Sequence, residues 1–405
     1  MEQSSTHIES THSDSHRMER PKYEVADILR LYLDDYLKDH TLSTHQHKVV
    51  NDIIACRTSK LGYHKIKCDV CDYERIEYDS CRNRHCPKCQ GSKRLQWVND
   101  RLNELLPVPY YHCVFTMIHL LNTLALYNKE LIYDIFLKSS ARTLQDFAED
   151  PKYLGAKIGF VGILHTWGQP LCQHVHVHFI VPAGGISLDE SRWIHLPYRK
   201  KFLFPVKAMS RRMRKLFCEM LQQAYDDGKL VFPDDLDHLK DPQHFKRFLN
   251  KVAWDNWINY VKKPFSTPEN VVKYIGRYTH RVAISNHRII DIADGNVTFK
   301  YNEYKDGHVT PKIMTLKAEE FIRRFLLHIL PKGFKKIRYF GIFSNGLRKK
   351  YLQLARELLN VAREKLEQVE SCLNDLLEKL FKCPCCEVGM LHVIEVYKPV
   401  KFKPG

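Results

Sequence analysis

The segment that decides the fold is His174-Val-His-Val-His-Phe-Ile-Val181, in which histidine and apolar residues alternate. A β-strand places successive side chains on opposite faces, so the three histidines share one face and the apolar residues share the other. A second strand, Gly159–Trp167, precedes it, and a tight connection near residues 168–172 would bring His165 opposite His176. The sequence therefore predicts a β-hairpin with a face of imidazoles.

This histidine face predicts a metal site. Imidazoles that converge from two strands are hard to bury unless they hold a divalent ion, so we predict His176 and His178 as ligands and His165 as the third. His174 or Gln169 are alternatives for the third position. The competing interpretation is that these histidines are buried core residues.

The segments around the hairpin predict an α+β domain with a mainly antiparallel sheet. Tyr110 to Ile118 is rich in aromatic and β-branched residues and predicts a strand. The other predicted elements are a helix over 129–147, several helices between 205 and 279, and strands near 282–292 and 297–304.

Cysteines near the N-terminus predict a zinc module. Cys68-x-x-Cys71 and Cys86-x-x-Cys89 are two Cys-x-x-Cys pairs, the spacing that four-thiolate zinc sites use. Four interleaved donors suggest a second zinc, with small buried thiols and a surface histidine as the alternative; they are Cys56, His64, Cys81 and His85.

The C-terminal region predicts one long helix or a helical pair over 348–381, followed by a short cysteine cluster. Cys383, Cys385 and Cys386, with His392 nearby, supply only two or three donors. An incomplete metal site and ordinary thiols are both open interpretations.

Composition and charge favour a polyanionic partner. The 405 residues carry 63 Lys and Arg against 47 Asp and Glu, a net charge of +16. No run of roughly 18 apolar residues exists to span a bilayer, the first twenty residues are polar, and no Gly-x-x-x-x-Gly-Lys-[Ser/Thr] loop is found. We expect a soluble cytoplasmic protein without a nucleotide cofactor and with a disordered tail over 1–20.

Two tyrosines are candidate nucleophiles. Thr267-Pro268-Glu269 is typical of a helix start, and Tyr274 and Tyr278 would then lie on one helix face. Amphipathic packing is the competing interpretation for such a pair.

Basic residues beside these motifs are candidates for DNA binding, with a solvated helix face as the alternative for the last two. They are Arg82, Arg84 and Lys88 near the cysteines, Lys273, Arg277 and Arg281 near the tyrosines, and Arg211 and Arg212 in a basic run over 199–215.

Four blocks together resemble the two-tyrosine rolling-circle transposases of the insertion sequence ninety-one type, which belong to the His-hydrophobic-His (HUH) endonucleases. The resemblance covers roughly residues 45 to 345. The blocks are Cys81–Gln90, Leu164–Gly168, His176–Gly185 and Tyr274–Ser285.

The resemblance implies a ferredoxin-like or RNA-recognition-like antiparallel sheet with the histidines on a central strand. It also implies Mg²⁺ or Mn²⁺ at the histidines, attack by Tyr274 or Tyr278 on single-stranded DNA at the element ends, and a 5′-phosphotyrosine intermediate. The expected division of the chain is a tail (1–20), a helical zinc-binding module (21–106), an HUH catalytic domain (107–345) and a C-terminal helical extension with the cysteine cluster (346–405).

Two other functions fit the sequence. A plasmid replication initiator or relaxase would share the cleavage chemistry without moving its own gene. A non-catalytic zinc-ribbon DNA-binding regulator would use the histidine strand and the tyrosines only for packing.

Overall fold

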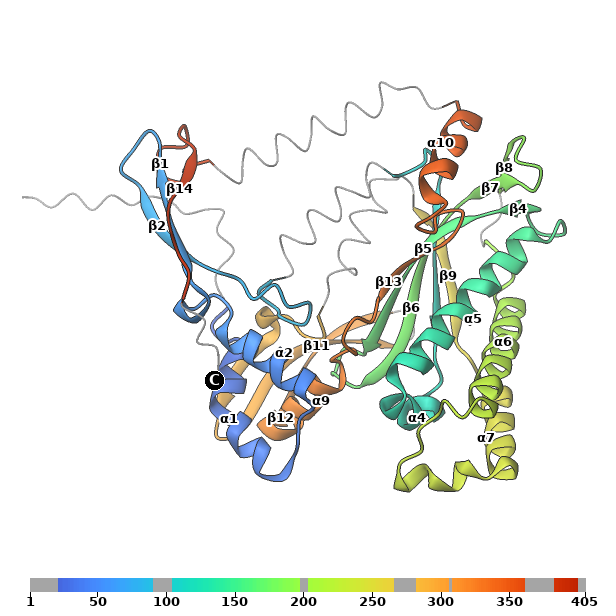
Figure 1. Cartoon of the computed structure of the whole chain (residues 1–405), viewed down its shortest axis with the longest axis horizontal. Helices are drawn as coiled ribbons and strands as arrows, with labels where there is room; N and C mark the ends of the chain where they lie inside the picture. The colour runs from blue at the N-terminus through green and yellow to red at the C-terminus, as the bar shows by residue number, and fades with distance from the viewer. Residues whose placement is uncertain are drawn as a thin grey trace, which may run out of the picture.

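A computed structural model describes residues 21–89, 104–196, 203–265, 282–305, 308–360 and 382–399, and within them the strands form four sheets. Figure 1 shows a large sheet with helices along one side, a smaller helical body that contains the N-terminal helices, and a narrow three-stranded ribbon projecting from that body. Within the described ranges, no helix is long and apolar enough to cross a membrane.

The large sheet is antiparallel throughout and has the strand order β13-β5-β6-β3-β9. Its central strand, β6, therefore carries the histidines. The strands are β3 (Tyr110–Thr116), β5 (Gly159–Trp167), β6 (Gln173–Pro182), β9 (Asn259–Phe265) and β13 (Ile337–Gly341).

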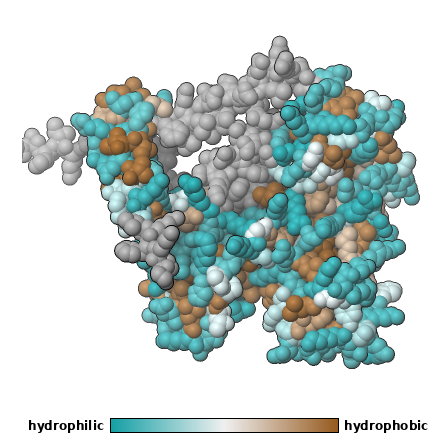
Figure 2. Space-filling model, in the orientation of Figure 1, coloured by the Kyte–Doolittle hydropathy of each residue, from teal (hydrophilic) through white to brown (hydrophobic). Residues whose placement is uncertain are grey.

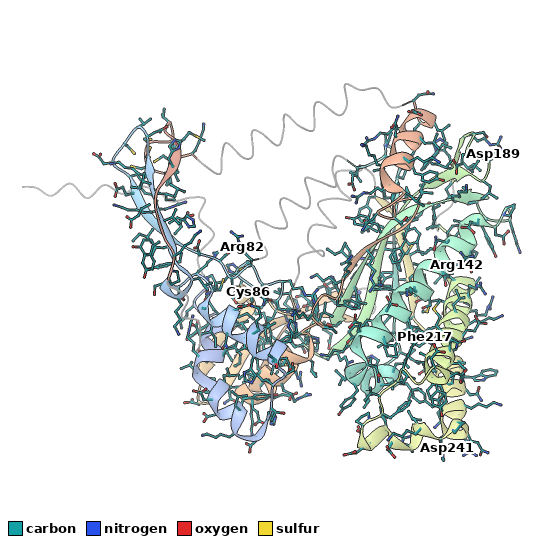
Figure 3. All side chains as sticks on the ribbon, viewed as in Figure 1. Arg82, Cys86, Arg142, Asp189, Phe217 and Asp241 are labelled. Carbon is teal, nitrogen blue, oxygen red and sulfur yellow. The ribbon has the colours of Figure 1, made fainter. Side chains whose placement is uncertain are left out.

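One face of this sheet packs against a layer of helices (Figure 1). Val175, Val177 and Phe179 are fully buried in that core, which confirms the predicted alternation along β6. Phe217 of α6 joins the same core, and Figure 3 labels it together with Arg142 of α5. The helices are α4 (Asn122–Tyr127), α5 (Lys129–Glu149), α6 (Val206–Asp226) and α7 (Pro242–Trp254).

The opposite face carries the histidines at one end and an apolar cluster at the other. Ile163 and Ile180 lie in that cluster, where Tyr351 and Leu352 of α10 (Arg348–Leu358) cover them. A small sheet with the order β4-β7-β8 adjoins this cluster through Ile186; its strands are β4 (Ala156–Lys157), β7 (Gly184–Ser187) and β8 (Trp193–His195).

The N-terminal helices share a second core with a distant part of the chain. A Ser43 side chain that accepts from the Gln46 N–H caps the second of them. Residues of both helices pack against the sheet β10-β11-β12 and the helix that follows it. The elements are α1 (Val25–Asp39), α2 (Thr44–Ala55), β10 (Ile289–Ala293), β11 (Asn296–Lys305), β12 (His308–Lys317) and α9 (Ala318–Leu327).

The ribbon joins the two ends of the described chain. Its strands are β1 (Tyr63–Cys68), β2 (Glu74–Tyr78) and β14 (Leu391–Tyr397), in the order β14-β1-β2. Figure 2 shows apolar residues gathered on its surface, and Ile76 and Val393 are among its exposed side chains.

The predicted α+β class with an antiparallel sheet is confirmed. Two local predictions are wrong: β9 is a strand inside a segment predicted to be helical, and Asn286–Arg288 is a short 3-10 turn where a strand was predicted. The predicted tail over 1–20, and the part of the C-terminal helix over 361–381, lie outside the described residues.

Candidate metal centres and active site

The histidine hairpin has the predicted register. His165 of β5 lies directly opposite His176 of β6, and His178 lies opposite Ile163. One nitrogen from each of the three histidines falls within 4.8 Å of the others. The ring centroids are 5.3 Å apart for His165 and His176, and 4.8 Å apart for His176 and His178. This geometry lets three imidazoles bind one ion.

Burial favours the neutral form of His178, which is the form that binds metals. His165 and His178 are 2% and 5% exposed, while His176 is more open. Desolvation, reinforced by His165 and His176, holds the pKa of His178 well below its usual range. An ion would therefore reach the site from the side of His176, which is the most exposed of the three histidines.

Backbone contacts and hydrogen bonds orient the rings. Nδ1 of His176 lies 2.9 Å from the carbonyl oxygen of His174, so Nδ1 carries the proton and Nε2 is the ligand atom. His174 is not in the group of three. Gln169 is engaged elsewhere: its side-chain Oε1 accepts from the Asn302 N–H at 3.5 Å, and its backbone carbonyl accepts from Arg288 at 2.6 Å.

His112 is a residue of the site that the sequence analysis missed. It lies on β3 next to β6, is fully buried, and places Nε2 at 2.8 Å from Nδ1 of His178. Burial lowers the pKa of His112 to about 3, so its ring is neutral. With His112 as acceptor, His178 keeps its proton on Nδ1 and presents Nε2 to an ion, as metal-binding histidines do when a second residue holds them.

A basic pocket adjoins the histidines. Trp167 stacks on His165 with a centroid separation of 4.7 Å and lines a pocket together with Arg84, His85 and Lys336. Burial, with Arg84 nearby, lowers the pKa of Lys336 to about 8. Within the described residues this places positive charge close to the imidazole cluster.

The predicted tyrosines Tyr274 and Tyr278 lie outside the described residues, as do Lys273, Arg277 and Arg281. Their flanks are described. Strand β9 ends at Phe265, and the chain resumes at Val282, which lines the basic pocket with Trp167.

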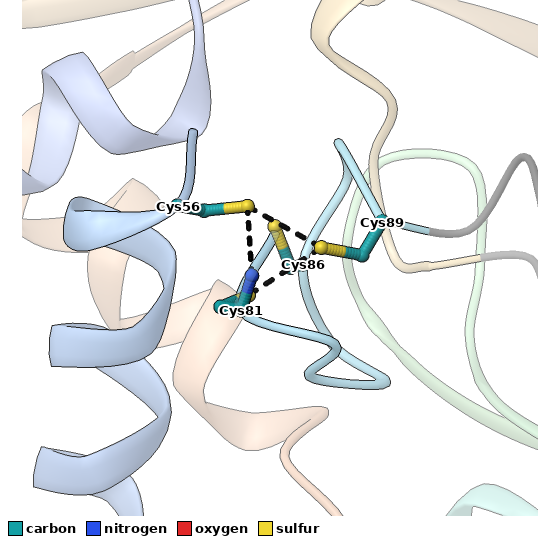
Figure 4. Close-up of side chains that lie close together, drawn as sticks. All are labelled: Cys56, Cys81, Cys86 and Cys89. Carbon is teal, nitrogen blue, oxygen red and sulfur yellow. Dashed lines mark hydrogen bonds between the residues drawn. The ribbon is translucent and has the colours of Figure 1, made fainter. Parts of the chain in front are cut away.

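The first cysteine cluster consists of Cys56, Cys81, Cys86 and Cys89, whose sulfurs converge in Figure 4. It lies where the end of α2 meets the loop before residue 90, and Figure 3 labels Cys86 and Arg82 on this loop. The Sγ of Cys89 is 3.3 Å from that of Cys56 and 3.5 Å from that of Cys81. Hydrogen bonds from Cys81 and Cys86 lower the pKa of the Cys56 thiol to about 7.

The predicted grouping of the cysteines needs correction. Cys86 and Cys89 join Cys56 and Cys81, whereas Cys68 and Cys71 lie with Cys383 and Cys386 of the C-terminal cluster. Spacing identified each Cys-x-x-Cys pair but not which pairs share an ion. That depends on the path of the chain through β1 and β2.

The two histidines predicted to join a second zinc are placed otherwise. His64 contacts Asp79 at 2.9 Å, and neither His64 nor His85 belongs to a described metal-ligand group. His85 instead lines the basic pocket, where burial and Arg84 hold its pKa well below the usual range.

The first cluster fits structural zinc. A tetrahedral ion with metal–sulfur bonds of about 2.3 Å holds its sulfurs about 3.8 Å apart, close to the separations found here. Backbone N–H groups of Cys81 and Asn83 point at Cys56 and Cys81, which stabilises thiolates.

Of the predicted DNA-binding residues that the structure describes, at least three have contacts within the protein. Arg84 donates to the carbonyls of Pro331 and Phe334, and Lys88 contacts Glu24 at 2.7 Å. Arg211 and Arg212 lie on α6, across the sheet from the histidines, and Arg212 contacts Asp146 at 2.6 Å. Arg82 lies on the loop of the first cluster with a positive φ of 53°.

Comparison with known proteins gives the family. A "Transposase zinc-binding domain" family model matches residues 28–117, and a "Putative transposase" model matches residues 159–350. The chain is 44% identical over 395 residues to "Putative transposase y4qJ" of Sinorhizobium fredii, covering 96% of this chain and 98% of the relative.

A second relative is the "Transposase for insertion sequence element IS801" of Pseudomonas savastanoi pv. phaseolicola. It is 28% identical over 367 residues, which cover 89% of this chain and 86% of the relative. The zinc-binding match covers the first cysteine cluster, and the transposase match covers His165, His176 and His178. These matches establish that the chain belongs to the IS91 family of transposases.

Proposed function

We propose that this transposase nicks single-stranded DNA at the ends of its element by tyrosine attack at a metal-bound phosphate, and that it promotes rolling-circle transposition. The observation that carries the proposal is the convergence of His165, His176 and His178 on one face of an antiparallel sheet. Packing alone does not explain this cluster, because apolar side chains would fill the same positions without the cost of burying polar nitrogens.

The fold supports this proposal. Strand β6 is the central strand of five, helices cover one face, and the histidines occupy the other face. A ferredoxin-like HUH domain needs the same arrangement, because two of its metal ligands project side by side from a central strand.

His165, His176 and His178 would hold a Mg²⁺ or Mn²⁺ ion. When bound, the ion supplies polarisation of the scissile phosphate and offsets charge in the transition state. His112 keeps His178 in the ligand tautomer, and the carbonyl of His174 does the same for His176.

Tyr274 and Tyr278 are the proposed nucleophiles. The phenolic oxygen loses its proton and bonds to phosphorus, and the 3′ oxygen leaves and takes up a proton. The products are a 5′-phosphotyrosine and a free 3′-OH, so the phosphoester energy is retained without a nucleotide cofactor. A second tyrosine would allow a second strand to be cleaved while the first remains attached.

The charge distribution suits a nucleic-acid substrate. The net charge is +16, and Lys336 and Arg84 line a pocket that Trp167 shares with the histidine cluster. A DNA phosphate at the pocket would place the next phosphates of the strand near the histidines. Element ends and target DNA are the proposed partners.

The test is cleavage of labelled single-stranded end oligonucleotides with Mg²⁺ or Mn²⁺. We expect metal-dependent nicking by the wild type, and DNA binding without nicking by a His176→Ala/His178→Ala variant. His238→Ala, an exposed histidine on the turn before α7, is the matched control and should nick normally. Undiminished metal-dependent nicking by the double variant would refute the proposal.

A further inference from the structure

The ribbon β14-β1-β2 has almost no hydrophobic core. Ile66 and Cys68 are the buried residues of β1, and every residue of β2 and β14 is at least partly exposed. A sheet of this size cannot order itself by apolar burial alone and needs a covalent or metal cross-link. The ribbon must therefore be held by something other than packing.

Cysteines gather at one end of this ribbon. Cys68, Cys71, Cys383 and Cys386 place their sulfurs within 4.8 Å of one another. The Cys68–Cys386 and Cys71–Cys383 separations are both 3.7 Å, close to the roughly 3.8 Å between sulfurs on a tetrahedral zinc and far from the roughly 2.05 Å of a disulfide.

The two Cys-x-x-Cys loops have the same local geometry. The N–H of Val70 points at the sulfur of Cys68, and the N–H of Cys385 points at the sulfur of Cys383, at 3.4 Å in each case. Backbone amides that point at a sulfur stabilise its thiolate, which is the form that binds zinc.

Gly389 shows that the backbone is packed closely around the sulfurs. A Cβ at this position would lie 2.4 Å from the Cys68 sulfur, and the Gly389 N–H points at Cys386 at 3.2 Å. Met390 also donates to Asp69 at 2.7 Å, which ties the C-terminal loop to the N-terminal one.

We propose that Cys68, Cys71, Cys383 and Cys386 bind a second structural Zn²⁺ that fastens the C-terminal segment to the N-terminal ribbon. Cys383 and Cys386 lie outside both family matches, which cover residues 28–117 and 159–350. Zinc replaces four thiol protons, so its binding free energy becomes folding free energy for the ribbon. The N-terminal and C-terminal segments each supply half of the ligands, and β14 pairs with β1 from Tyr63 to Cys68 with one bulge.

The first test is zinc content of the purified full chain, measured by native mass spectrometry together with metal analysis. We expect two zinc ions in the wild type and one in Cys383→Ser/Cys386→Ser. Cys385→Ser is the matched control, because Cys385 is exposed on the same loop and outside the cluster, and should keep two. A wild-type content of one zinc, or two zinc ions in the double variant, would overturn the proposal.

The second test uses the wild type, so it does not depend on how a variant folds. Cysteine alkylation is followed residue by residue with and without a chelator. We expect Cys71 and Cys386 to react slowly in the zinc-loaded protein and to become reactive together on chelation, while Cys385 reacts quickly throughout. Equal reactivity of Cys386 and Cys385 before chelation would contradict a zinc site. Neither test involves DNA cleavage, so failure here leaves the proposed nicking chemistry untouched.

Discussion

At the scale of single residues, His112 contacts a proposed metal ligand but lies outside the group of three histidines. His112 sits on β3 with Nε2 at 2.8 Å from Nδ1 of His178. Residues that hold a metal-binding imidazole in this way typically affect metal affinity ten- to a hundredfold, or roughly 1.4 to 3 kcal/mol.

We predict that His112→Ala weakens Mn²⁺ binding about ten- to a hundredfold, measured by electron paramagnetic resonance titration. His112→Gln should recover part of the affinity, because the Gln side-chain oxygen can accept from His178. His238→Ala should bind Mn²⁺ as the wild type does. Wild-type affinity in both His112 variants, with an unchanged melting profile, would show that His112 is a packing residue.

Lys336 gives a second residue-scale prediction. Its folded-state pKa of about 8 is below the ordinary value, so between pH 8 and about 10.5 the unfolded chain binds more protons. The free energy of unfolding of the wild type therefore rises with pH across that window. Lys336→Met should be about 1–2 kcal/mol more stable than the wild type below pH 8, and the difference should shrink towards pH 10.5.

The same variant should bind single-stranded DNA less tightly, with a shallower salt dependence by about 0.7 in the log–log slope, because one phosphate contact is lost. Lys240→Met, on the turn before α7 and 62% exposed, is the control for charge alone. Unchanged DNA affinity in Lys336→Met would show that DNA does not contact the basic pocket.

Local sequence patterns predicted part of the site. The register of His165 against His176 followed from strict alternation and a short connection, both of which act over about twenty residues. His112 could not be found in this way, because a lone histidine in an apolar strand is usually a core residue. Its importance comes from the pairing of β3 with β6, which is a long-range contact.

At the scale of elements, the cysteine pairs show the same limit. Each Cys-x-x-Cys pair is a local turn that spacing identifies. Which pairs share an ion depends on the path of β1 and β2 and on the return of β14 from the far end of the chain. The strands around the histidines needed no such information.

The first cysteine cluster makes an element-scale prediction. Cys56 and Cys89 are buried in the same core as α1, α2 and α9. Cys56→Ser should therefore remove one zinc and destabilise this core by several kcal/mol, seen as a lower melting temperature. Cys172→Ser, an exposed cysteine in the histidine hairpin turn, is the control. Wild-type zinc content and melting in Cys56→Ser would mean that this cluster is not a metal site.

At the scale of the whole molecule, distant parts of the chain meet repeatedly around the candidate active site. Segment 283–329 packs with the N-terminal helices, and Arg84 of the first cysteine loop reaches the carbonyls of Pro331 and Phe334. The loop of the first cluster is thereby joined to the wall of the basic pocket. Structural zinc at this loop would hold the pocket in shape next to the histidines.

In the proposed mechanism, a tyrosine in the segment between Phe265 and Val282 attacks the DNA. Tyr260 is the main competitor among the described residues, because it is 40% exposed and its ring lies 6.3 Å from that of His112. Phenylalanine keeps the ring and removes the reactive oxygen, so Tyr274→Phe/Tyr278→Phe separates attack from packing.

The most direct measurement is denaturing electrophoresis of protein incubated with a 5′-extended single-stranded end oligonucleotide and Mg²⁺ or Mn²⁺, followed by peptide mapping of any adduct. We predict a detergent-resistant protein–DNA adduct on Tyr274 or Tyr278 in the wild type and in Tyr260→Phe, and none in the Tyr274→Phe/Tyr278→Phe variant. An adduct that persists in that variant, or that maps to Tyr260, would contradict the proposed mechanism.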